Sequence, residues 1–125
     1  MKVLIVEDNE ALAQTTGWIV EMLGYDYRLS LTPRDAMAAG PDYLPDVVLM
    51  DIGLPGMSGY DLCREMRQYP ALARTVFIAQ TGWDEREHGA QSEAAGFRHH
   101  LTKPVDLKTL EGVLNGIAED MLARG

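Results

Sequence analysis

The most constraining feature of the sequence is a short apolar run that ends in a carboxylate. Residues Val47 to Met50 are four consecutive apolar residues, and Asp51 follows them directly. Four residues are too few for a buried helix, whereas a parallel strand covered on both faces has this pattern. In open α/β sheets, reactive groups lie beyond the carboxyl ends of the strands. The position of Asp51 therefore makes it a candidate reactive group.

Runs of the same kind predict the rest of the sheet. Buried strands are predicted at residues 3–6, 47–51 and 76–79, a last short strand at residues 97–101, and an edge strand at residues 25–30, where Asp26, Arg28 and Ser30 form the wet face. Helices are predicted after Asn9 and up to Gly24, from Pro33 to Gly40-Pro41, from Ser58 to before Pro70, over residues 84–95, and after Asp106. This alternation of five strands and five helices predicts an α/β, flavodoxin-like, doubly wound parallel sheet with strand order 2-1-3-4-5.

Length and composition bound the function. We expect one domain over residues 1–125, because this length suffices for a single core. The net charge of −8 argues against binding to nucleic acid or to an anionic membrane surface. Cys63 is the single cysteine, which excludes an internal disulfide and fits a reducing compartment. No apolar run approaches the roughly 20 residues of a membrane span, and no signal peptide precedes the first strand, so we expect a cytoplasmic location.

Charged and polar residues follow four of the predicted strands. Glu7 and Asp8 come after the first strand, Asp51 ends the third, and Thr81 and Lys103 follow the fourth and fifth. The predicted strand order places the first and third strands side by side, so the three carboxylates come together. Two like charges about 4 Å apart repel by about 4 kcal/mol at an effective dielectric constant near 20. A site with oxygen ligands alone suits Mg²⁺, which would offset this repulsion.

These groups together are the parts that phosphoryl transfer requires. A carboxylate such as Asp51 can act as the nucleophile, while a metal ion and Lys103 neutralise the phosphoryl oxygens and Thr81 donates a hydrogen bond. Taken singly, each residue has a common structural explanation as a helix cap, a turn residue or a solvated lysine. Their coincidence at one edge of one sheet favours a site.

Over its whole length the chain resembles the receiver domain of a two-component response regulator. The matching pieces are Glu7-Asp8, Asp51 within LMDIGLPGMSGY, Thr81-Gly82 and Lys103-Pro104. The resemblance implies that Asp51 accepts a phosphoryl group from a histidine kinase or a histidine phosphotransfer protein. It also implies that Asp8, Asp51 and the backbone carbonyl of Gly53 bind Mg²⁺ directly and that Glu7 acts mainly through a water molecule.

The resemblance further implies a switch. Thr81 moves toward the phosphoryl oxygen while the aromatic residue three positions before Lys103 turns inward; that position is His100 here, where relatives usually carry Tyr or Phe. Imidazole can titrate near neutral pH, so we hypothesise a mildly pH-sensitive switch. The family also implies a cis bond between Lys103 and Pro104. It implies self-catalysed phosphotransfer and autodephosphorylation, not turnover of an external substrate.

The predicted fourth helix bears on the output surface. Residues 84–95 are very polar and contain Gly89, so this helix is expected to be held weakly and to shift at small cost. Helix 4, strand 5 and helix 5 would form the face that a downstream protein reads, with the chain a monomer or a phosphorylation-dependent dimer. Trp83 either shades the site from water or packs on the surface. The segments GFRHHLTKPVD and TGW are similar to segments of the receivers of hybrid histidine kinases. The chain is therefore expected to be such a receiver, with a free-standing regulator as the alternative.

Three other functions compete with this interpretation. An aspartyl phosphatase usually carries a second acid two residues after the nucleophile, where this chain has Gly53. A flavin or nucleotide module would need a glycine-rich phosphate loop after the first strand, where Glu7 and Asp8 would repel phosphate instead. A docking domain that is never phosphorylated would not need the complete set of site residues.

Overall fold

The structure, a computed structural model, describes residues 1–82 and 93–124. The elements in chain order are β1 (Lys2–Val6), α1 (Glu10–Met22), β2 (Asp26–Ser30), α2 (Pro33–Tyr43), β3 (Val47–Asp51), α3 (Gly59–Met66), the 3₁₀ helix η1 (Pro70–Leu72), β4 (Val76–Thr81), β5 (Phe97–Thr102) and α5 (Leu107–Arg124). All paired strands are parallel, in the order β2-β1-β3-β4-β5, which confirms the predicted fold class. The helix predicted over residues 84–95 lies mostly outside the described residues, with residues 93–95 helical.

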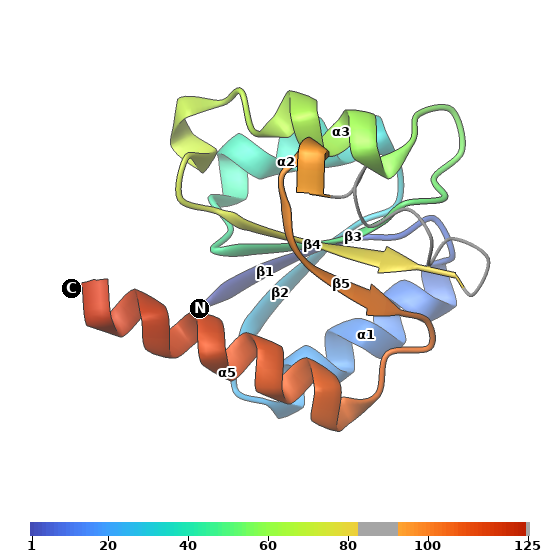
Figure 1. The fold of residues 1–125 in the computed structure, drawn as a ribbon. Helices are drawn as coiled ribbons and strands as arrows, with labels where there is room; N and C mark the ends of the chain where they lie inside the picture. Colours follow the sequence, from blue (N-terminus) through green and yellow to red (C-terminus); the bar gives the residue numbers. More distant parts are fainter. Residues whose placement is uncertain (83–92, 125) are drawn as a thin grey trace.

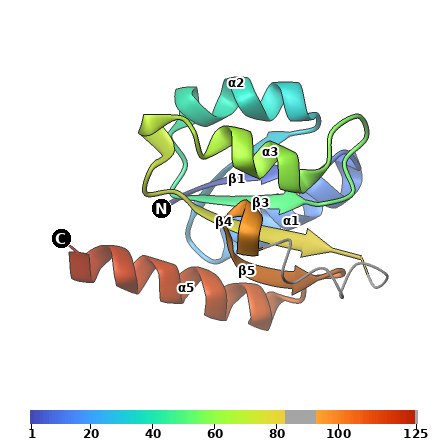
Figure 2. The same cartoon turned by 45° about the horizontal axis from the view of Figure 1, so that its top comes forward.

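Two helical layers cover the sheet. Helices α2 and α3 lie on one face, and α1 and α5 lie on the other (Figure 1, Figure 2). Successive residues of each central strand feed the two cores in turn: Leu4 and Val48 pack beneath α2 and α3, whereas Ile5 and Leu49 pack against α1 and α5. Cys63 is buried in the first core, and burial raises the pKa of its thiol to about 12. No helix in the described part of the chain is long and apolar enough to cross a membrane.

Strand β2 lies at the edge of the sheet, as its alternating pattern predicts. Asp26 and Arg28 are exposed, but Ser30, predicted on the wet face, is fully buried. The Glu7 N–H donates a hydrogen bond to the Ser30 carbonyl at 3.0 Å. The prediction for Ser30 was wrong because the segment after β1 continues the pairing there and covers the end of β2.

Helix α2 runs past the stop that Gly40-Pro41 predicted. It continues to Tyr43 and ends at Leu44, which has a left-handed backbone with φ of 54°. Proline removes one helical donor, but the Leu44 N–H still donates to the Gly40 carbonyl at 2.9 Å. Gly40 also packs so closely that a Cβ there would lie 2.9 Å from the Met66 side chain. This packing of α2 against α3 holds the last turn in place, so the predicted end was wrong.

Side chains cap the helices where the sequence predicts. Asn9, Ser58 and Asp106 each accept a hydrogen bond from a backbone N–H three residues later, at 3.1, 3.2 and 2.7 Å. In α5, residues Leu110, Leu114 and Ile117 are buried. Leu107 and Met121 have the same helical spacing but are 42% and 38% exposed, because they lie near the two ends of the helix. Figure 1 shows the carboxyl-terminal end of α5 extending beyond the sheet.

Candidate functional site

The topology brings three carboxylates together at the carboxyl edge of the sheet. Strands β1 and β3 are parallel neighbours, with Val6 paired to Met50, so the residues that follow them meet. Glu7, Asp8 and Asp51 each place a carboxylate oxygen within 4.8 Å of the others. Glu7 and Asp51 are buried, at 2% and 5% exposure, whereas Asp8 is exposed to solvent.

Lys103 supplies the counter-charge from the end of β5. Its Nζ lies 2.8 Å from Glu7 Oε1 and 3.0 Å from Asp51 Oδ1, so one ammonium bridges the two buried acids. The Lys103 N–H donates to the Thr81 carbonyl at 2.7 Å, which fixes the backbone from which the side chain extends. This bridge connects the ends of three separate strands, β1, β3 and β5.

Burial and pairing act on the pKa values of this cluster in opposite directions. Burial raises the pKa of Glu7 above its ordinary value, although the hydrogen bonds from Lys103 and from the Asn9 N–H lower it. For Lys103, burial lowers the pKa, but the hydrogen bonds and charges of Glu7 and Asp51 outweigh that effect and raise it overall. The Lys103 ammonium is therefore held in its charged form. Ionisation of Glu7, one of its two carboxylate partners, is disfavoured by burial.

Backbone amides hold the buried carboxylates in position. The Asn9 N–H donates to Glu7 Oε2 at 3.0 Å, and the Gly53 N–H donates to Asp51 Oδ1 at 3.0 Å. Both bonds reach back two residues, so each acid is oriented by the loop that follows its own strand. The contacts of Lys103 and Gly53 fall on the same oxygen of Asp51.

Gly59 allows α3 to begin directly against this edge. A Cβ at Gly59 would lie 2.6 Å from the Asp51 carbonyl oxygen and 2.7 Å from Ile52 Cα, both backbone atoms. The Gly59 N–H donates to the Ile52 carbonyl at 2.9 Å. Sequence reasoning did not identify this residue. The signal was a glycine directly after the Ser58 cap, at a helical position where glycine costs about 1 kcal/mol relative to alanine.

Thr81 and His100 form a second contact at the same edge. Thr81 is fully buried at the end of β4, one position past the pairing of Asp51 with Gln80. His100 Nε2 lies 2.9 Å from Thr81 Oγ1, and that oxygen is 3.5 Å from the Leu101 carbonyl oxygen. Within the described residues, the Thr81 hydroxyl therefore makes its hydrogen-bond contacts to β5 and not to the acid cluster.

The donor set fits a hard divalent cation. It offers carboxylate oxygens from three residues, of which Asp8 is open to solvent, and a single lysine against three acids leaves a surplus of negative charge. The predicted residues Glu7, Asp8, Asp51 and Lys103 thus lie in one cluster, and Gly53 adjoins it through its N–H. The Lys103–Pro104 bond is cis, as the resemblance implied.

A doubly wound sheet with acids after its first and third strands, and a lysine after its fifth, defines the class of receiver-type switch domains. The family model of the response regulator receiver domain matches residues 3–115. The chain therefore belongs to this family and is the phosphorylation-controlled switch domain of two-component response regulators.

Similarity to individual response regulators and receiver domains supports the family assignment. The chain is 29% identical over 116 residues to protein PilH of Pseudomonas aeruginosa, covering 93% of this chain and 96% of PilH. It is 33% identical over 103 residues, or 82% of this chain, to the phosphate regulon transcriptional regulatory protein PhoB of Rhizobium meliloti, of which it spans 45%. It is similar to the CheY-like receiver domain structure from Methylobacillus flagellatus, with a TM-score of 0.86 and 32% identity, over 94% of this chain and 98% of that one.

Proposed function

We propose that Asp51 is the phosphoacceptor and takes its phosphoryl group from the phosphohistidine of a histidine kinase or a histidine phosphotransfer protein. A carboxylate oxygen of Asp51 attacks phosphorus and forms an acyl phosphate while the phosphorus–nitrogen bond breaks. The electron pair of that bond returns to the imidazole nitrogen. Water later hydrolyses the acyl phosphate and restores the carboxylate. The domain thus catalyses its own modification and has no turned-over external substrate.

The observation that carries this proposal is the bridge from Lys103 to Glu7 and Asp51. An ammonium 3.0 Å from Asp51 Oδ1 is within reach of a phosphoryl group on that carboxylate, where it would neutralise an oxygen. The Gly53 N–H already orients the same carboxylate. Lys103 would then exchange part of its contact with the acids for contact with the phosphoryl group.

Mg²⁺ is the proposed cofactor. Asp8, Asp51 and the Gly53 carbonyl would hold it directly, and Glu7 mainly through water. When bound, it would neutralise charge on the phosphoryl oxygens. The exposure of Asp8 beside two buried acids supports a site that solvent and a partner can reach.

Thr81 and His100 are the proposed switch pair. Phosphorylation would draw the Thr81 hydroxyl toward a phosphoryl oxygen and alter its contact with His100 Nε2, which lies 2.9 Å away. Because His100 belongs to β5, the change would pass to the face formed by helix 4, β5 and α5, where a downstream protein would read it. Most of that fourth helix, and Trp83 with it, lies outside the described residues.

The remaining features of the proposal concern the whole domain. We assign residues 1–125 to one receiver domain, either free-standing or part of a hybrid histidine kinase, and place it in the cytoplasm. Its partners would be proteins and not nucleic acid or membrane, because the net charge is −8. It would act as a monomer or as a phosphorylation-dependent dimer.

Phosphotransfer with a matched control tests the assignment. Wild type, Asp51→Asn and Asp26→Asn are incubated with Mg²⁺ and phosphorylated histidine kinases, and the mass of each protein is measured. Asp26 is an exposed aspartate on the edge strand β2, so its variant should gain one phosphoryl group as wild type does. The Asp51→Asn protein should gain none. A phosphoryl group retained in Asp51→Asn would overturn the assignment.

A docking domain that is never phosphorylated remains the second candidate. Beryllofluoride with Mg²⁺ imitates an acyl phosphate and separates the two functions without a kinase. The proposed function predicts shifts of the Asp51, Gly53 and Thr81 amide resonances in the NMR spectrum. An unperturbed spectrum would favour the docking domain.

A further inference from the structure

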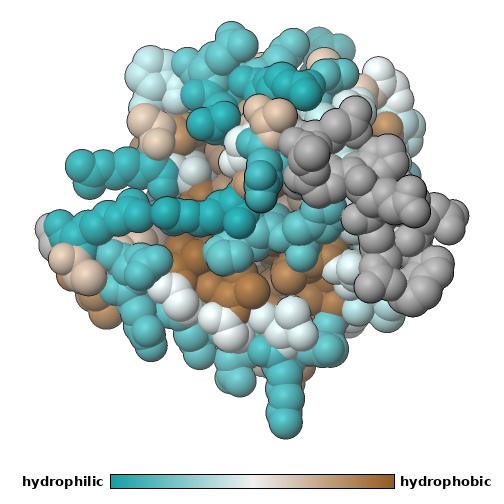
Figure 3. Space-filling model, in the orientation of Figure 1, coloured by the Kyte–Doolittle hydropathy of each residue, from teal (hydrophilic) through white to brown (hydrophobic). Residues whose placement is uncertain are grey.

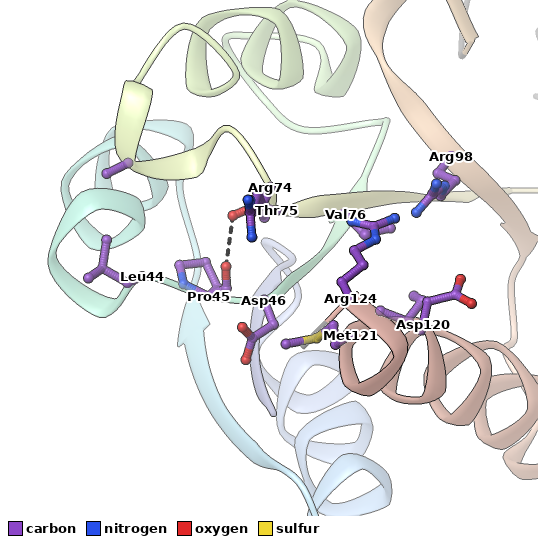
Figure 4. A pocket seen from close by; sticks show the side chains of 12 residues that line it. Leu44, Pro45, Asp46, Arg74, Thr75, Val76, Arg98, Asp120, Met121 and Arg124 are labelled. Carbon is purple, nitrogen blue, oxygen red and sulfur yellow. Dashed lines mark hydrogen bonds between the residues drawn. The ribbon is translucent and has the colours of Figure 1, made fainter.

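Two adjoining cavities lie at the amino-terminal edge of the sheet, the opposite edge from the acid cluster. The first, of about 340 Å³, is lined by four arginines, Arg67, Arg74, Arg98 and Arg124, and we call it the arginine cavity. The second, of about 220 Å³, shares three of these arginines and adds apolar residues: Leu44, Pro45, Ala71, Ile117 and Met121. Figure 4 shows Arg98 and Arg124 extending beside Val76, with Arg74 farther along the same cavity.

The four arginines come from four separate parts of the chain. Arg67 caps the carboxyl end of α3, Arg74 lies between η1 and β4, Arg98 is the second residue of β5, and Arg124 ends α5. They account for four of the 11 lysines and arginines in a chain of net charge −8. All four are exposed. In the view of Figure 1, the left side of the molecular surface shows extended hydrophilic side chains beside a hydrophobic area (Figure 3).

In the described part of the chain, no carboxylate forms an ion pair with this cluster. Across residues 1–82 and 93–124, the side-chain ion pairs involve Arg28, Arg64 and Lys103 and none of the four arginines. Arg67 Nη1 makes a long contact of 3.4 Å to the Ala95 carbonyl oxygen. The described lining of the arginine cavity includes no acidic residue.

The neighbouring cavity differs in this respect. Its lining includes Asp46 and Asp120, but Asp46 Oδ2 already accepts the Lys2 N–H at 2.7 Å. The arginine cavity therefore favours an anion. The apolar residues of the adjoining cavity favour contact with an apolar group.

Helix ends explain only part of the cluster. Arg67 and Arg124 lie at the carboxyl ends of α3 and α5, where the helix dipole stabilises a positive charge. Arg74 and Arg98 lie on a loop and a strand, where no such stabilisation applies. Bringing four like charges to one cavity costs energy that a bound anion would offset.

We propose that the arginine cavity binds a small anion that carries two or more phosphate groups and a part with an apolar face, such as a nucleoside diphosphate with its aromatic base. The planar guanidinium fork matches two phosphate oxygens at once, and arginine is the preferred residue for such recognition. A volume of about 340 Å³ exceeds what one phosphate fills, and four arginines can share two phosphate groups. The apolar part of the ligand lies over Ile117 and Met121 in the adjoining cavity. This site is separate from the phosphoacceptor edge and does not rest on the function proposed there.

Titrations without Mg²⁺ test the proposal, because the acid cluster then repels anions. Adenosine diphosphate, pyrophosphate and adenosine are each added to the full chain, and backbone amide shifts are followed by NMR. The diphosphate and pyrophosphate should bind saturably, with the largest shifts near Thr75 and Arg98, and binding should weaken as salt rises. Adenosine should bind at least about tenfold more weakly than the diphosphate. Equal binding of adenosine, or shifts centred on Gly53, would overturn the proposal.

Charge reversal identifies the residues. Arg74→Glu and Arg98→Glu should each weaken diphosphate binding by about tenfold or more. The matched control is Arg34→Glu, an exposed arginine on α2 outside both cavities, which should leave binding within about twofold of wild type. Circular dichroism checks the fold, and Arg74→Gln offers a milder change if a reversal unfolds the chain. If the control and the cavity variants lost diphosphate binding equally, or if neither cavity variant lost it, the arginine cavity would not be a specific binding site.

Discussion

The two edges of the sheet carry opposite charges, and they are built in different ways. At the carboxyl edge, Glu7 and Asp51 are buried, bridged by Lys103 and held by backbone amides. At the amino edge, four arginines are exposed, and among the described residues their side-chain hydrogen bonds are limited to a long one from Arg67. One strand, β5, connects the two, because it begins next to Arg98 and ends just before Lys103. A parallel sheet thus keeps two sites of opposite charge apart on one rigid scaffold.

The comparison also separates a fixed site from an open one. Burial of the carboxylates destabilises the acidic edge, and their hydrogen bonds offset part of that cost. Because these bonds are present without a ligand, the geometry of the acidic edge is set before a ligand binds. The arginine edge incurs little burial cost and has little internal bonding. Changes at the acidic edge should therefore alter the free energy of unfolding strongly, whereas changes at the arginine edge should alter binding more than that free energy.

The largest expected effect follows from Gly59→Ala. The new Cβ would lie 2.6 Å from the Asp51 carbonyl oxygen and 2.7 Å from Ile52 Cα, and neither backbone atom can move without disturbing β3. We expect a loss of about 2–3 kcal/mol in the free energy of unfolding, measured by urea denaturation. The control is Gly112→Ala in α5, where nothing lies within 4 Å of the new Cβ. That variant should gain about 0.5–1 kcal/mol, because alanine favours a helix.

A Gly59→Ala protein as stable as wild type would mean that the acidic edge can expand. The edges would then differ in charge but not in rigidity.

Lys103→Met should have the next largest effect. It leaves Glu7 and Asp51, at 2% and 5% exposure, without their shared cation. We expect a loss of about 1–3 kcal/mol at pH 7, less than for a fully buried pair because the Lys103 side chain is 24% exposed. Lys108→Met, an exposed lysine on α5, is the control and should change stability by less than about 0.5 kcal/mol.

The pH dependence of the Lys103 contribution has a definite sign. The pKa of Lys103 is raised in the folded state above its ordinary value of 10.5. Its contribution to stability is therefore fully present below pH 10.5 and is lost as pH rises through the folded pKa. The difference between wild type and Lys103→Met should stay constant from neutral pH to about pH 10 and shrink above it. A difference that grows with pH in that range would contradict the bridge.

Glu7→Gln should have a smaller effect of opposite sign. Burial raises the pKa of Glu7 above its ordinary value of 4.5, so ionised Glu7 is unfavourable in the folded protein. The stability that its protonated form provides is present below pH 4.5 and is lost as pH rises through the folded pKa. The variant should therefore match wild type near pH 4 and be more stable than wild type at pH 7.

Mg²⁺ should make wild type more stable than Glu7→Gln at pH 7, the reverse of the order without the metal. Binding to the folded state stabilises by mass action, and the acid cluster of wild type offers one more charged ligand than that of Glu7→Gln. Thermal unfolding at rising Mg²⁺ concentration should show a larger gain for wild type. Equal gains in the two proteins would remove Glu7 from the proposed metal site.

Much of the fold follows from local patterns in the sequence. The apolar runs predicted the strands, Asn9 and Ser58 predicted their helix caps, and the strand order predicted that residues after β1 and β3 meet. What failed depended on contacts between distant segments. The end of α2 depends on how Gly40 packs against α3, and the burial of Ser30 depends on the chain that follows β1.

The same reasoning explains why one edge was predicted and the other was not. Glu7 directly follows β1, Asp51 ends β3 and Lys103 directly follows β5, so strand order alone brings them together. Arg67 and Arg124 lie at helix ends that the strand pattern does not position. Their meeting depends on the length and direction of α3 and α5, which only the folded chain reveals.

The smallest expected effect concerns His100 at the acidic edge. Its Nε2 lies 2.9 Å from Thr81 Oγ1. A protonated imidazole donates to that oxygen and leaves the hydroxyl proton free for a phosphoryl oxygen, whereas a neutral ring with its lone pair on Nε2 accepts that proton instead. Shifts of the Thr81 amide on adding beryllofluoride and Mg²⁺ should therefore be larger at pH 6 than at pH 8, by about twofold or less. His100→Phe should abolish the difference, while His99→Gln should retain it, because the contact to Thr81 belongs to His100 alone of the two histidines. Equal shifts of wild type at the two pH values would show that the acidic edge responds to phosphorylation through a contact that the imidazole charge does not govern.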